Sequence, residues 1–201
     1  MCQFKSAIVL KDRVYVPDHD HHSDMLEELG IPDDFAHASK VFVRVEVSPA
    51  DGDVLSDVYG WKLKVDQDIL PDWWDEKVEA KRVKDAIKEW CDVHILRSGN
   101  HVVKEGVWYA CNNATVKACN NATVTAYDNA TVKAYGNATV TACNSATVTA
   151  CDSATVTACN NATVILLKLY QTCNTVKLNG EAICVNHKTK KIRSAVKWEV
   201  E

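Results

Sequence analysis

Apolar and polar positions alternate between residues 110 and 165 in an eight-residue pattern that is written seven times without a gap: ACNNATVK, ACNNATVT, AYDNATVK, AYGNATVT, ACNSATVT, ACDSATVT and ACNNATVI. The Ala and Val positions share one face of an extended chain, and the Thr, Lys and Cys or Tyr positions share the other, because successive side chains of a strand point to opposite sides. The pair before each Ala-Thr-Val consists of Asn, Asp, Gly or Ser, which are turn residues. The pattern therefore predicts one short strand and one tight corner per unit.

Two architectures fit these repeats. A β-solenoid places two units in each 16-residue coil, whereas an up-and-down meander uses each polar pair as a hairpin turn. Lys117 and Lys133 are 16 residues apart, so they would fall on one side of a two-sheet coil. A single-layer meander also leaves one face of a thin Ala and Val core uncovered. We therefore favour a solenoid of about three and a half coils and keep the meander as the alternative.

The residues before the repeats predict a small α+β domain. A hairpin over residues 2–16, turning at Lys11-Asp12, is expected first. It is followed by a helix from Ser23 or Asp24, with Asp24 and Glu27 spaced as a capping box and Gly30 as the stop. The remaining predicted elements are strands over residues 41–47 and 61–65, then a long helix opened by Pro71-Asp72 with Ala80, Val83, Ile87 and Trp90 at helical spacing.

The chain is therefore expected to have four parts. These are an α+β head over residues 1–96, a degenerate repeat and N-terminal cap over 97–109, the solenoid over 110–165, and C-terminal capping strands over 166–201. The degenerate repeat is RSGNHVVK, which aligns with AYGNATVT, and atypical units at the ends of a solenoid close its core. In the C-terminal cap Asn179-Gly180 predicts a hairpin turn, and residues 182–185 and 191–193 predict its paired strands.

Charge is distributed unevenly along the chain, and this distribution disfavours some classes of binding partner. The formal net charge is −4; residues 1–109 hold 14 Lys and Arg against 22 Asp and Glu, the repeats hold two of each, and residues 166–201 hold seven against three. Neutral repeats argue against mimicry of the DNA backbone, which needs rows of carboxylates. Nucleic acid is also disfavoured by the acidic head, although residues 187–193 form a short basic stretch. No apolar run predicts a signal peptide or a membrane span, so we expect a cytoplasmic protein.

The nine cysteines do not predict a disulfide framework. Five of them occupy the second position of the repeat, which Tyr127 and Tyr135 fill in other units. A position that accepts Cys or Tyr is a packing or surface position and not an obligatory bridge or metal ligand.

Several stretches together resemble an uncharacterised group of phage and gut-bacterial proteins. They are the opening MCQFKSAIVL, His22 before the MLEELGIPD helix, the VRVEVSP strand from Val43, the WKLKVD…PDWW segment from Trp61 and the Asn-Ala-Thr-Val tail. Members of this group look like a small N-terminal domain joined to a repeat tail of varying length. The resemblance covers nearly the whole chain and implies a phage or bacterial cytoplasmic setting, but it supplies no activity.

One candidate for chemistry is Cys2. Removal of Met1 would leave a thiol and an α-amine on one residue, which resembles the N-terminal Cys of class II glutamine amidotransferases and of proteins that crosslink to abasic DNA. His22 and Glu46 are the available partners for such a nucleophile. Those families continue Met-Cys-Gly, whereas this chain has Gln3. The alternative is that Cys2 is a small hydrophobic residue that begins an edge strand.

Three further candidates concern binding. The loop Asp18-His19-Asp20-His21-His22 contains metal-binding residue types, but consecutive residues cannot all face one ion, so no metal and no cofactor are predicted. Trp73 and Trp74, with Trp90 and Trp108, could form an aromatic ligand platform or belong to the core. In a solenoid with 16 residues per coil, three Thr-Val-Thr triplets would form a flat two-column array that resembles the surface of solenoid antifreeze proteins: Thr123, Thr125, Thr139, Thr141, Thr155 and Thr157. Thr is also a good outward residue on any strand.

The sequence favours a non-enzymatic binding protein, a phage accessory protein that acts in host interaction or counter-defence. The head would recognise a protein or a small ligand, and the solenoid would serve as a spacer, a platform or a surface for homo-oligomer formation. This interpretation rests on two observations: the repeats contain no cluster of ionisable side chains, and the head contains no complete catalytic motif. Its alternatives are an enzyme that uses Cys2 as nucleophile and an ice-binding solenoid.

Overall fold

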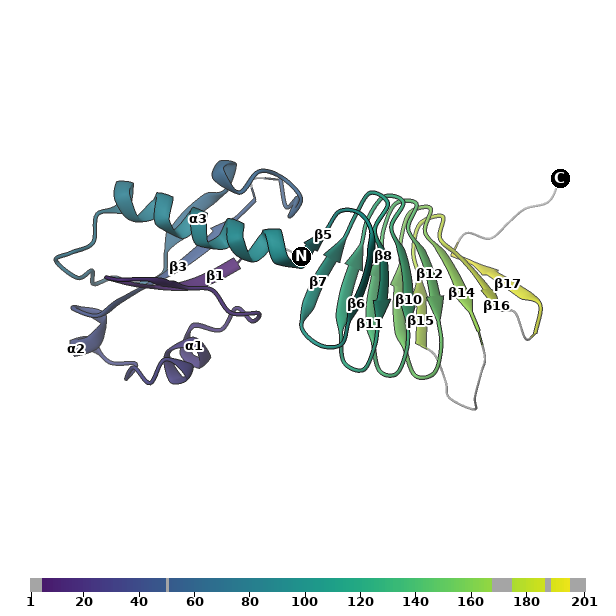
Figure 1. Cartoon of the computed structure of the whole chain (residues 1–201), viewed down its shortest axis with the longest axis horizontal. Coiled ribbons are helices and arrows are strands. Elements are labelled where there is room, and N and C mark those ends of the chain that lie inside the picture. The colour runs from purple at the N-terminus through teal and green to yellow at the C-terminus, as the bar shows by residue number, and fades with distance from the viewer. Residues whose placement is uncertain (1–4, 50, 168–174, 187–188, 196–201) are drawn as a thin grey trace. The chain divides into compact units, whose positions relative to one another are not determined.

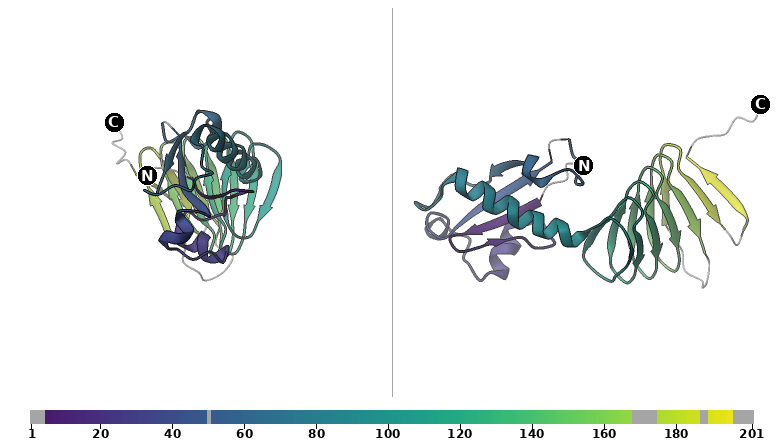
Figure 2. Two further views of the ribbon diagram at one scale, coloured as in Figure 1. Left: turned by 90° about the vertical axis from the view of Figure 1, so that its left-hand side faces the viewer. Right: turned by 45° about the horizontal axis from the view of Figure 1, so that its top comes forward.

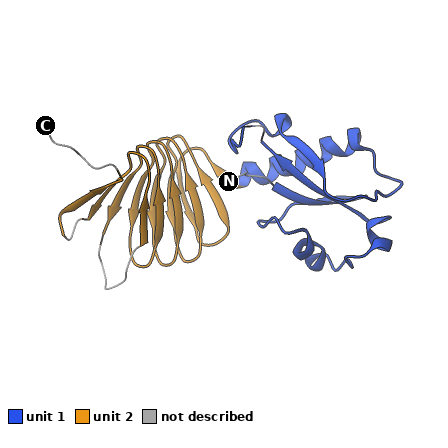
Figure 3. Cartoon of the chain, turned by 180° about the vertical axis from the view of Figure 1, so that it is seen from behind, with its two compact units in different colours: residues 1–93 blue, residues 94–201 orange. Residues whose placement is uncertain are grey.

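The computed structural model describes residues 5–49, 51–167, 175–186 and 189–195. The chain divides into two units, residues 1–93 and residues 94–201 (Figure 3). From here on, the first unit is called the head and the second the solenoid.

The head is built on a four-stranded antiparallel sheet. Its strands are β1 (Lys5–Leu10), β2 (Val14–Tyr15), β3 (Phe42–Ser48) and β4 (Lys62–Val65), in the order β2-β1-β3-β4. Every residue of β1 is buried, because helices cover both faces of the sheet: α3 lies over one face, and α1 and α2 lie over the other (Figure 1). The strands expected near residues 41–47 and 61–65 are confirmed, and in the hairpin expected over residues 2–16 the pairs are Ile8 with Tyr15 and Val9 with Val14.

The helices differ in detail from the prediction. They are α1 (His22–Glu28), α2 (Phe35–Ala38), a 3₁₀ turn η1 (Val58–Gly60) and α3 (Glu76–His94). The capping box is wrong: α1 has His21 at its N-cap and no side-chain cap bond. Helix α3 begins at Glu76 and not directly after Pro71-Asp72, because the Trp74 amide donates to the Pro71 carbonyl and closes a separate turn. The short helix α2 was not predicted.

The buried side of α3 also differs slightly from the expected one. Its buried residues are Glu79, Val83, Ile87 and Cys91, at intervals of four. Glu79 can be buried because Arg82 lies 2.9 Å from its carboxylate. The Arg82 guanidinium also donates to the Leu10 carbonyl at 2.8 Å, which joins α3 to the end of β1.

The second unit is a β-solenoid of two facing parallel sheets, so the solenoid is confirmed and the meander is wrong. Each repeat strand pairs with the strand 16 residues away, as Thr131 pairs with Thr115 and Thr147. Figure 2 shows the coils stacked along the unit. One sheet contains β6 (Asn100–Val103), β8 (Thr115–Ala118), β10 (Thr131–Ala134), β12 (Thr147–Ala150), β14 (Thr163–Leu166), β16 (Ile183–Asn186) and β17 (Lys191–Ser194). The other contains β5 (Ile95–Leu96), β7 (Val107–Ala110), β9 (Thr123–Ala126), β11 (Thr139–Ala142), β13 (Thr155–Ala158) and β15 (Thr175–Leu178).

The repeat residues divide cleanly between core and corners. The Val and Ala positions of both sheets are fully buried between them and form one continuous apolar core. The third position of every unit has a positive φ, which Gly, Asn and Asp adopt most readily. These corner residues are Asn112, Asn120, Asp128, Gly136, Asn144, Asp152 and Asn160. The polar pairs are therefore corners between sheets and not hairpin turns within one sheet.

The solenoid extends beyond the seven repeats at both ends, to about five coils in all. Strand β6, in the degenerate repeat, pairs with β8. At the other end, the predicted hairpin at Asn179-Gly180 is wrong, because this pair lies at the corner between β15 and β16, which belong to different sheets. Gly180 has φ 61°, the same left-handed conformation as the repeat corners. The predicted antiparallel pairing near residues 182–185 and 191–193 is confirmed as β16 with β17.

Candidate functional site

The proposed nucleophile Cys2 lies outside the described residues, but its two proposed partners are described. The His22 Nε2 lies 3.1 Å from the Val45 carbonyl oxygen, and its Nδ1 lies 3.4 Å from a carboxylate oxygen of Asp66. Glu46 lies 3.5 Å from the Lys64 Nζ. The structure thus engages both His22 and Glu46 within the head.

His22 and Glu46 belong to one network that also contains two residues not singled out from the sequence. Lys64 links the two sides, because its Nζ lies 3.4 Å from Asp66 and 3.5 Å from Glu46. A hydrogen bond to Asp66 and the charge of Glu46 raise the pKa of Lys64. The strand alternation of Lys62, Lys64 and Asp66 could have indicated that Lys64 and Asp66 share a face. The network joins the start of α1 to β3 and β4, and within it Lys64 lies between the carboxylates of Glu46 and Asp66.

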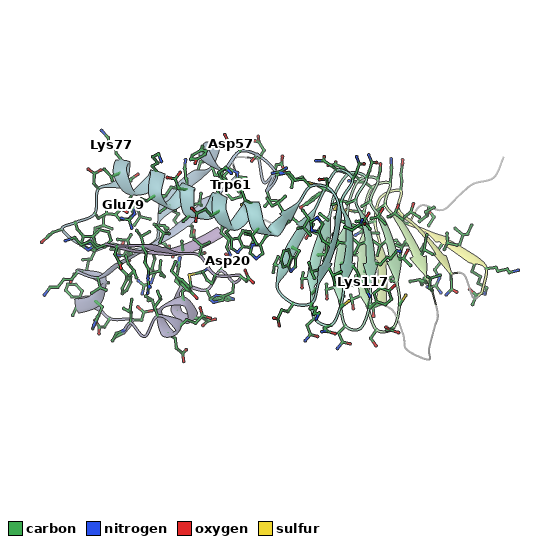
Figure 4. All side chains as sticks on the ribbon, viewed as in Figure 1. Asp20, Asp57, Trp61, Lys77, Glu79 and Lys117 are labelled. Carbon is green, nitrogen blue, oxygen red and sulfur yellow. The ribbon has the colours of Figure 1, made fainter. Side chains whose placement is uncertain are left out.

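The acidic and histidine-rich loop before α1 also has structural contacts. One carboxylate oxygen of Asp20 accepts hydrogen bonds from the Lys5 Nζ and the Ser6 amide, both at 3.1 Å (Figure 4). The His19 Nε2 lies 3.2 Å from both carboxylate oxygens of Glu28. Among the residues that the structure describes, no group of three or more His, Cys, Asp or Glu could hold a metal ion.

Trp73 and Trp74 form an aromatic pair, with ring centroids 6.2 Å apart in an edge-to-face arrangement. The Trp73 Nε1 donates to the Lys40 carbonyl at 2.8 Å. The Trp74 Nε1 is buried and has no hydrogen-bond partner in the described part of the chain. The other two candidate tryptophans have different neighbours: Trp90 lies under the Lys5 Nζ, and Trp108 stacks on His94.

The side chain of Gln67 joins two segments that are far apart in the sequence. Its Nε2 donates to the carbonyls of Ala38, Phe42 and Ile69 at 3.3, 3.2 and 2.6 Å, and its Oε1 accepts from the Arg44 amide at 2.9 Å. These bonds, with that of Trp73 to Lys40, fix residues 67–73 against the connection between α2 and β3. Sequence patterns gave no sign of Gln67, since a single Gln in a loop carries no periodic signal.

Exposed apolar side chains gather on the two segments that Gln67 joins. Phe35 is 70% exposed, Leu70 is 42% exposed, and Val41 and Ile69 are each 37% exposed. We call these four residues and the adjacent Trp73 the apolar patch. Scattered exposed apolar residues need no explanation, but a group of them on neighbouring segments is typical of an interaction surface.

The two segments that carry the apolar patch are rich in carboxylates. Residues 33–44 and 66–77 together hold seven Asp and Glu against three Lys and Arg, a formal charge of −4 for these two segments, of which Asp66 is paired with Lys64. One of the three cations, Arg44, is paired with Asp33 and lies over the Phe42 ring, so its charge is compensated. A second carboxylate, Asp34, has a lowered pKa, because it accepts hydrogen bonds from the His37 amide and then from the His37 ring. These segments therefore stay anionic at neutral pH.

The threonine pairs lie in equivalent places on three adjacent strands of one sheet. Thr139 pairs with Thr123 and Thr155, and Thr141 pairs with Thr125 and Thr157. The array ends after three strands, because the next positions in the second column are Tyr109 on one side and Lys177 on the other. Of these six threonines, Thr139 is exposed and the other five are partly buried. Ice binding by this array stays a prediction.

Comparisons with known proteins add no family or relative: no protein-family model, no curated protein and no solved structure matches the chain. Among the described residues, no helix is long and apolar enough to cross a membrane. The candidate sites are therefore judged on their own geometry. On that basis the apolar patch is an exposed surface of the head, whereas His22 and Glu46 belong to a network of contacts within the head.

Proposed function

We propose that this chain is a non-enzymatic binding protein whose head binds a positively charged protein segment through the apolar patch. The observation that carries the proposal is the gathering of Phe35, Val41, Ile69, Leu70 and Trp73 on two segments rich in carboxylates. Apolar burial supplies affinity, and opposite charge speeds encounter and selects the partner.

A protein segment fits this surface better than a small ligand does. Small ligands bind in concave sites that enclose most of their surface. Four of the patch side chains are instead exposed by 37% to 70%, and Trp73 is partly exposed, on segments joined by the bonds of Gln67. An amphipathic segment with Lys or Arg beside its apolar residues would cover these side chains and meet the carboxylates.

The solenoid has a supporting role in this proposal, as a spacer or platform joined to the head. The resemblance of the head motifs to phage and gut-bacterial proteins supports an accessory role in host interaction, in the cytoplasm of the host cell. The enzyme alternative gains no support from the described residues, because His22 and Glu46 are both engaged in the network that holds α1 to the sheet.

The test uses the full chain and two fluorescent peptides with the same leucine spacing, one with Lys and one with Glu at the polar positions. Binding is measured by fluorescence anisotropy at low and at high salt. We expect the Lys peptide to bind, salt to weaken it, and Phe35→Ala with Leu70→Ala to weaken it at least about tenfold. The matched control is Val93→Ala. Val93 is an apolar residue near the C-terminal end of α3, outside the apolar patch, and its side chain is 59% exposed.

The proposal fails if the Lys peptide does not bind, or if it binds no better than the Glu peptide. It also fails if Val93→Ala weakens binding as much as the double substitution, because the binding would then not depend on the apolar patch.

A further inference from the structure

The second position of the repeat forms vertical columns along the solenoid, one column at each of two corners. Residues that are 16 apart are neighbours in a column. For example, the Cys159 amide donates a hydrogen bond to the carbonyl of Ala142, the residue directly before Cys143. Cys or Tyr fills this position throughout the repeats. Within the seven repeats and Leu167, the column neighbours are Cys111 with Tyr127, Tyr127 with Cys143, Cys143 with Cys159, Cys119 with Tyr135, Tyr135 with Cys151, and Cys151 with Leu167. Cys143 and Cys159 are thus the one pair of this set that brings two sulfur atoms together.

The two sulfur atoms of this pair are very close. The Cys143 Sγ and the Cys159 Sγ are 2.7 Å apart. Two thiolates bound to one tetrahedral zinc ion would be about 3.8 Å apart, given zinc–sulfur bonds near 2.3 Å. A disulfide bond is about 2.05 Å long and joins Cα atoms that are about 4.4–6.8 Å apart, which includes the spacing of neighbouring strands. The arrangement therefore suits a disulfide better than a metal site.

The backbone around the pair is held in register on both sides. The amides of Cys143 and Cys159 donate to the carbonyls of Ala126 and Ala142, each at 2.9 Å. The next residues form a ladder at the same corner, where the Asn160 Nδ2 donates to the Asn144 Oδ1 at 3.2 Å. The two cysteines thus cannot separate without breaking contacts between coils.

We propose that Cys143 and Cys159 are a redox modification site, at which a low-molecular-weight disulfide converts the two thiols into a bond between neighbouring coils. The thiolate of one cysteine attacks the small disulfide and expels one small thiol, which leaves a mixed disulfide. The second cysteine then attacks the protein sulfur of that mixed disulfide and expels the second small thiol. Two electrons pass from the two protein thiols to the small disulfide, and the two protons end on the two small thiols released.

The protonation of Cys143 bears on which of the two cysteines begins the exchange. Burial, with the neighbouring Cys159, raises the pKa of Cys143 to about 12. Cys143 therefore stays protonated at neutral pH, and it is a poor target for alkylation although it is only half-buried. Cys143 is therefore not the cysteine that begins the exchange, and its closeness to Cys159, with the two sulfur atoms 2.7 Å apart, favours the second step, in which the bond closes.

The bond would close a loop of one coil and fix β11 to β13 at one corner. Parallel coils are otherwise joined by backbone hydrogen bonds and by apolar contacts with their neighbours, so a solenoid opens from its ends. A covalent link between two coils stops opening at that point. Oxidation would thus prevent the coils that contain Cys143 and Cys159 from separating when the solenoid opens from an end.

The test treats the folded full chain with oxidised glutathione, then unfolds it in denaturant at low pH, blocks the remaining thiols with N-ethylmaleimide and maps the cysteines without reduction. Cleavage after Lys and Arg and before Asp separates residues 134–151, which contain Cys143 and Cys151, from residues 152–168, which contain Cys159. We expect these two peptides to remain joined, with N-ethylmaleimide on Cys151. Cys159→Ser should abolish the joined species, whereas the matched variant Cys151→Ser should leave it unchanged.

A cysteine introduced into the other column gives a second and independent test. Tyr135→Cys would place a thiol between Cys119 and Cys151 in the other column, so this variant should gain one further disulfide there. The proposal is overturned if Cys143 and Cys159 carry only separate glutathione groups at equilibrium. It is also overturned if Cys151 replaces either of them in the joined species, because stacking in one column would then not decide the pairing.

Discussion

Truncation of one core valine tests the structure of the solenoid most directly. Val140 in β11 is fully buried and pairs in register with Val124 and Val156 on the neighbouring strands. The surrounding repeat core consists of Val and Ala side chains, which have little freedom to move into a space. Val140→Ala should therefore leave a cavity in the middle of the stack.

The expected cost follows from the two methyl groups that are removed. Their lost burial costs about 1.6 kcal/mol, at about 0.8 kcal/mol for each buried carbon. The cavity adds about 1 kcal/mol, because the walls of a stacked parallel core collapse little. The free energy of unfolding should thus fall by about 2.5 kcal/mol in total.

The assay is urea unfolding of the full chain, followed by circular dichroism in the β-sheet region. The matched control is Thr139→Val, which changes the adjacent exposed position and keeps a β-branched side chain. It should change the free energy of unfolding by less than about 0.5 kcal/mol. A loss below about 0.5 kcal/mol for Val140→Ala, or equal losses for the two variants, would refute the inward placement of the valines.

Two further predictions concern the register of the repeats and the stability of the head at acid pH. Deletion of residues 126–141 removes one whole coil and keeps every later residue in its sheet and column, so the shortened chain should fold with an unchanged circular dichroism signal per residue. Deletion of residues 126–130 removes a corner and inverts the alternation, so it should abolish the β-sheet signal of the solenoid; a folded product would contradict the two-sheet register. Glu28 has a lowered pKa, caused first by the hydrogen bond from the Tyr15 hydroxyl and then by His19. Its contribution to head stability should thus be present above the unfolded pKa of about 4.3 and be lost as the pH falls through the lower folded pKa. The difference in urea midpoint between wild type and Glu28→Gln, followed by tryptophan fluorescence, should therefore shrink in acid, and an unchanged difference would contradict this.

The repeats made the solenoid predictable because their information is local and is written several times. The alternation of Val and Thr determines which side chains face inward, and Asn, Asp or Gly at each third position permits the left-handed corner. The same local signal gave a wrong prediction at Asn179-Gly180, because residues that adopt the left-handed backbone conformation suit both a hairpin turn and a corner between sheets. The sheet in which the following strand lies decides between the two, and no local pattern records that.

The candidate binding surface was only partly predictable. Trp73 stood out in the sequence, but the joining of its segment to the one that carries Phe35 and Val41 depends on Gln67, whose amide reaches the Ala38 carbonyl across 29 residues of chain. Similarly, His22 and Glu46 were singled out as partners of Cys2, whereas Lys64 and Asp66, which connect them, were not.

The sequence by itself determined the strands, the corners and the 16-residue period of the solenoid, since side-chain alternation and backbone preference act over a few residues. Tertiary structure alone decided which exposed apolar side chains of the head share a surface. It also decided that Asn179-Gly180 is a corner between the two sheets and not a hairpin turn. Those outcomes depend on contacts between residues distant in the chain, whose free energy is gained only once the sheet and the coils have formed.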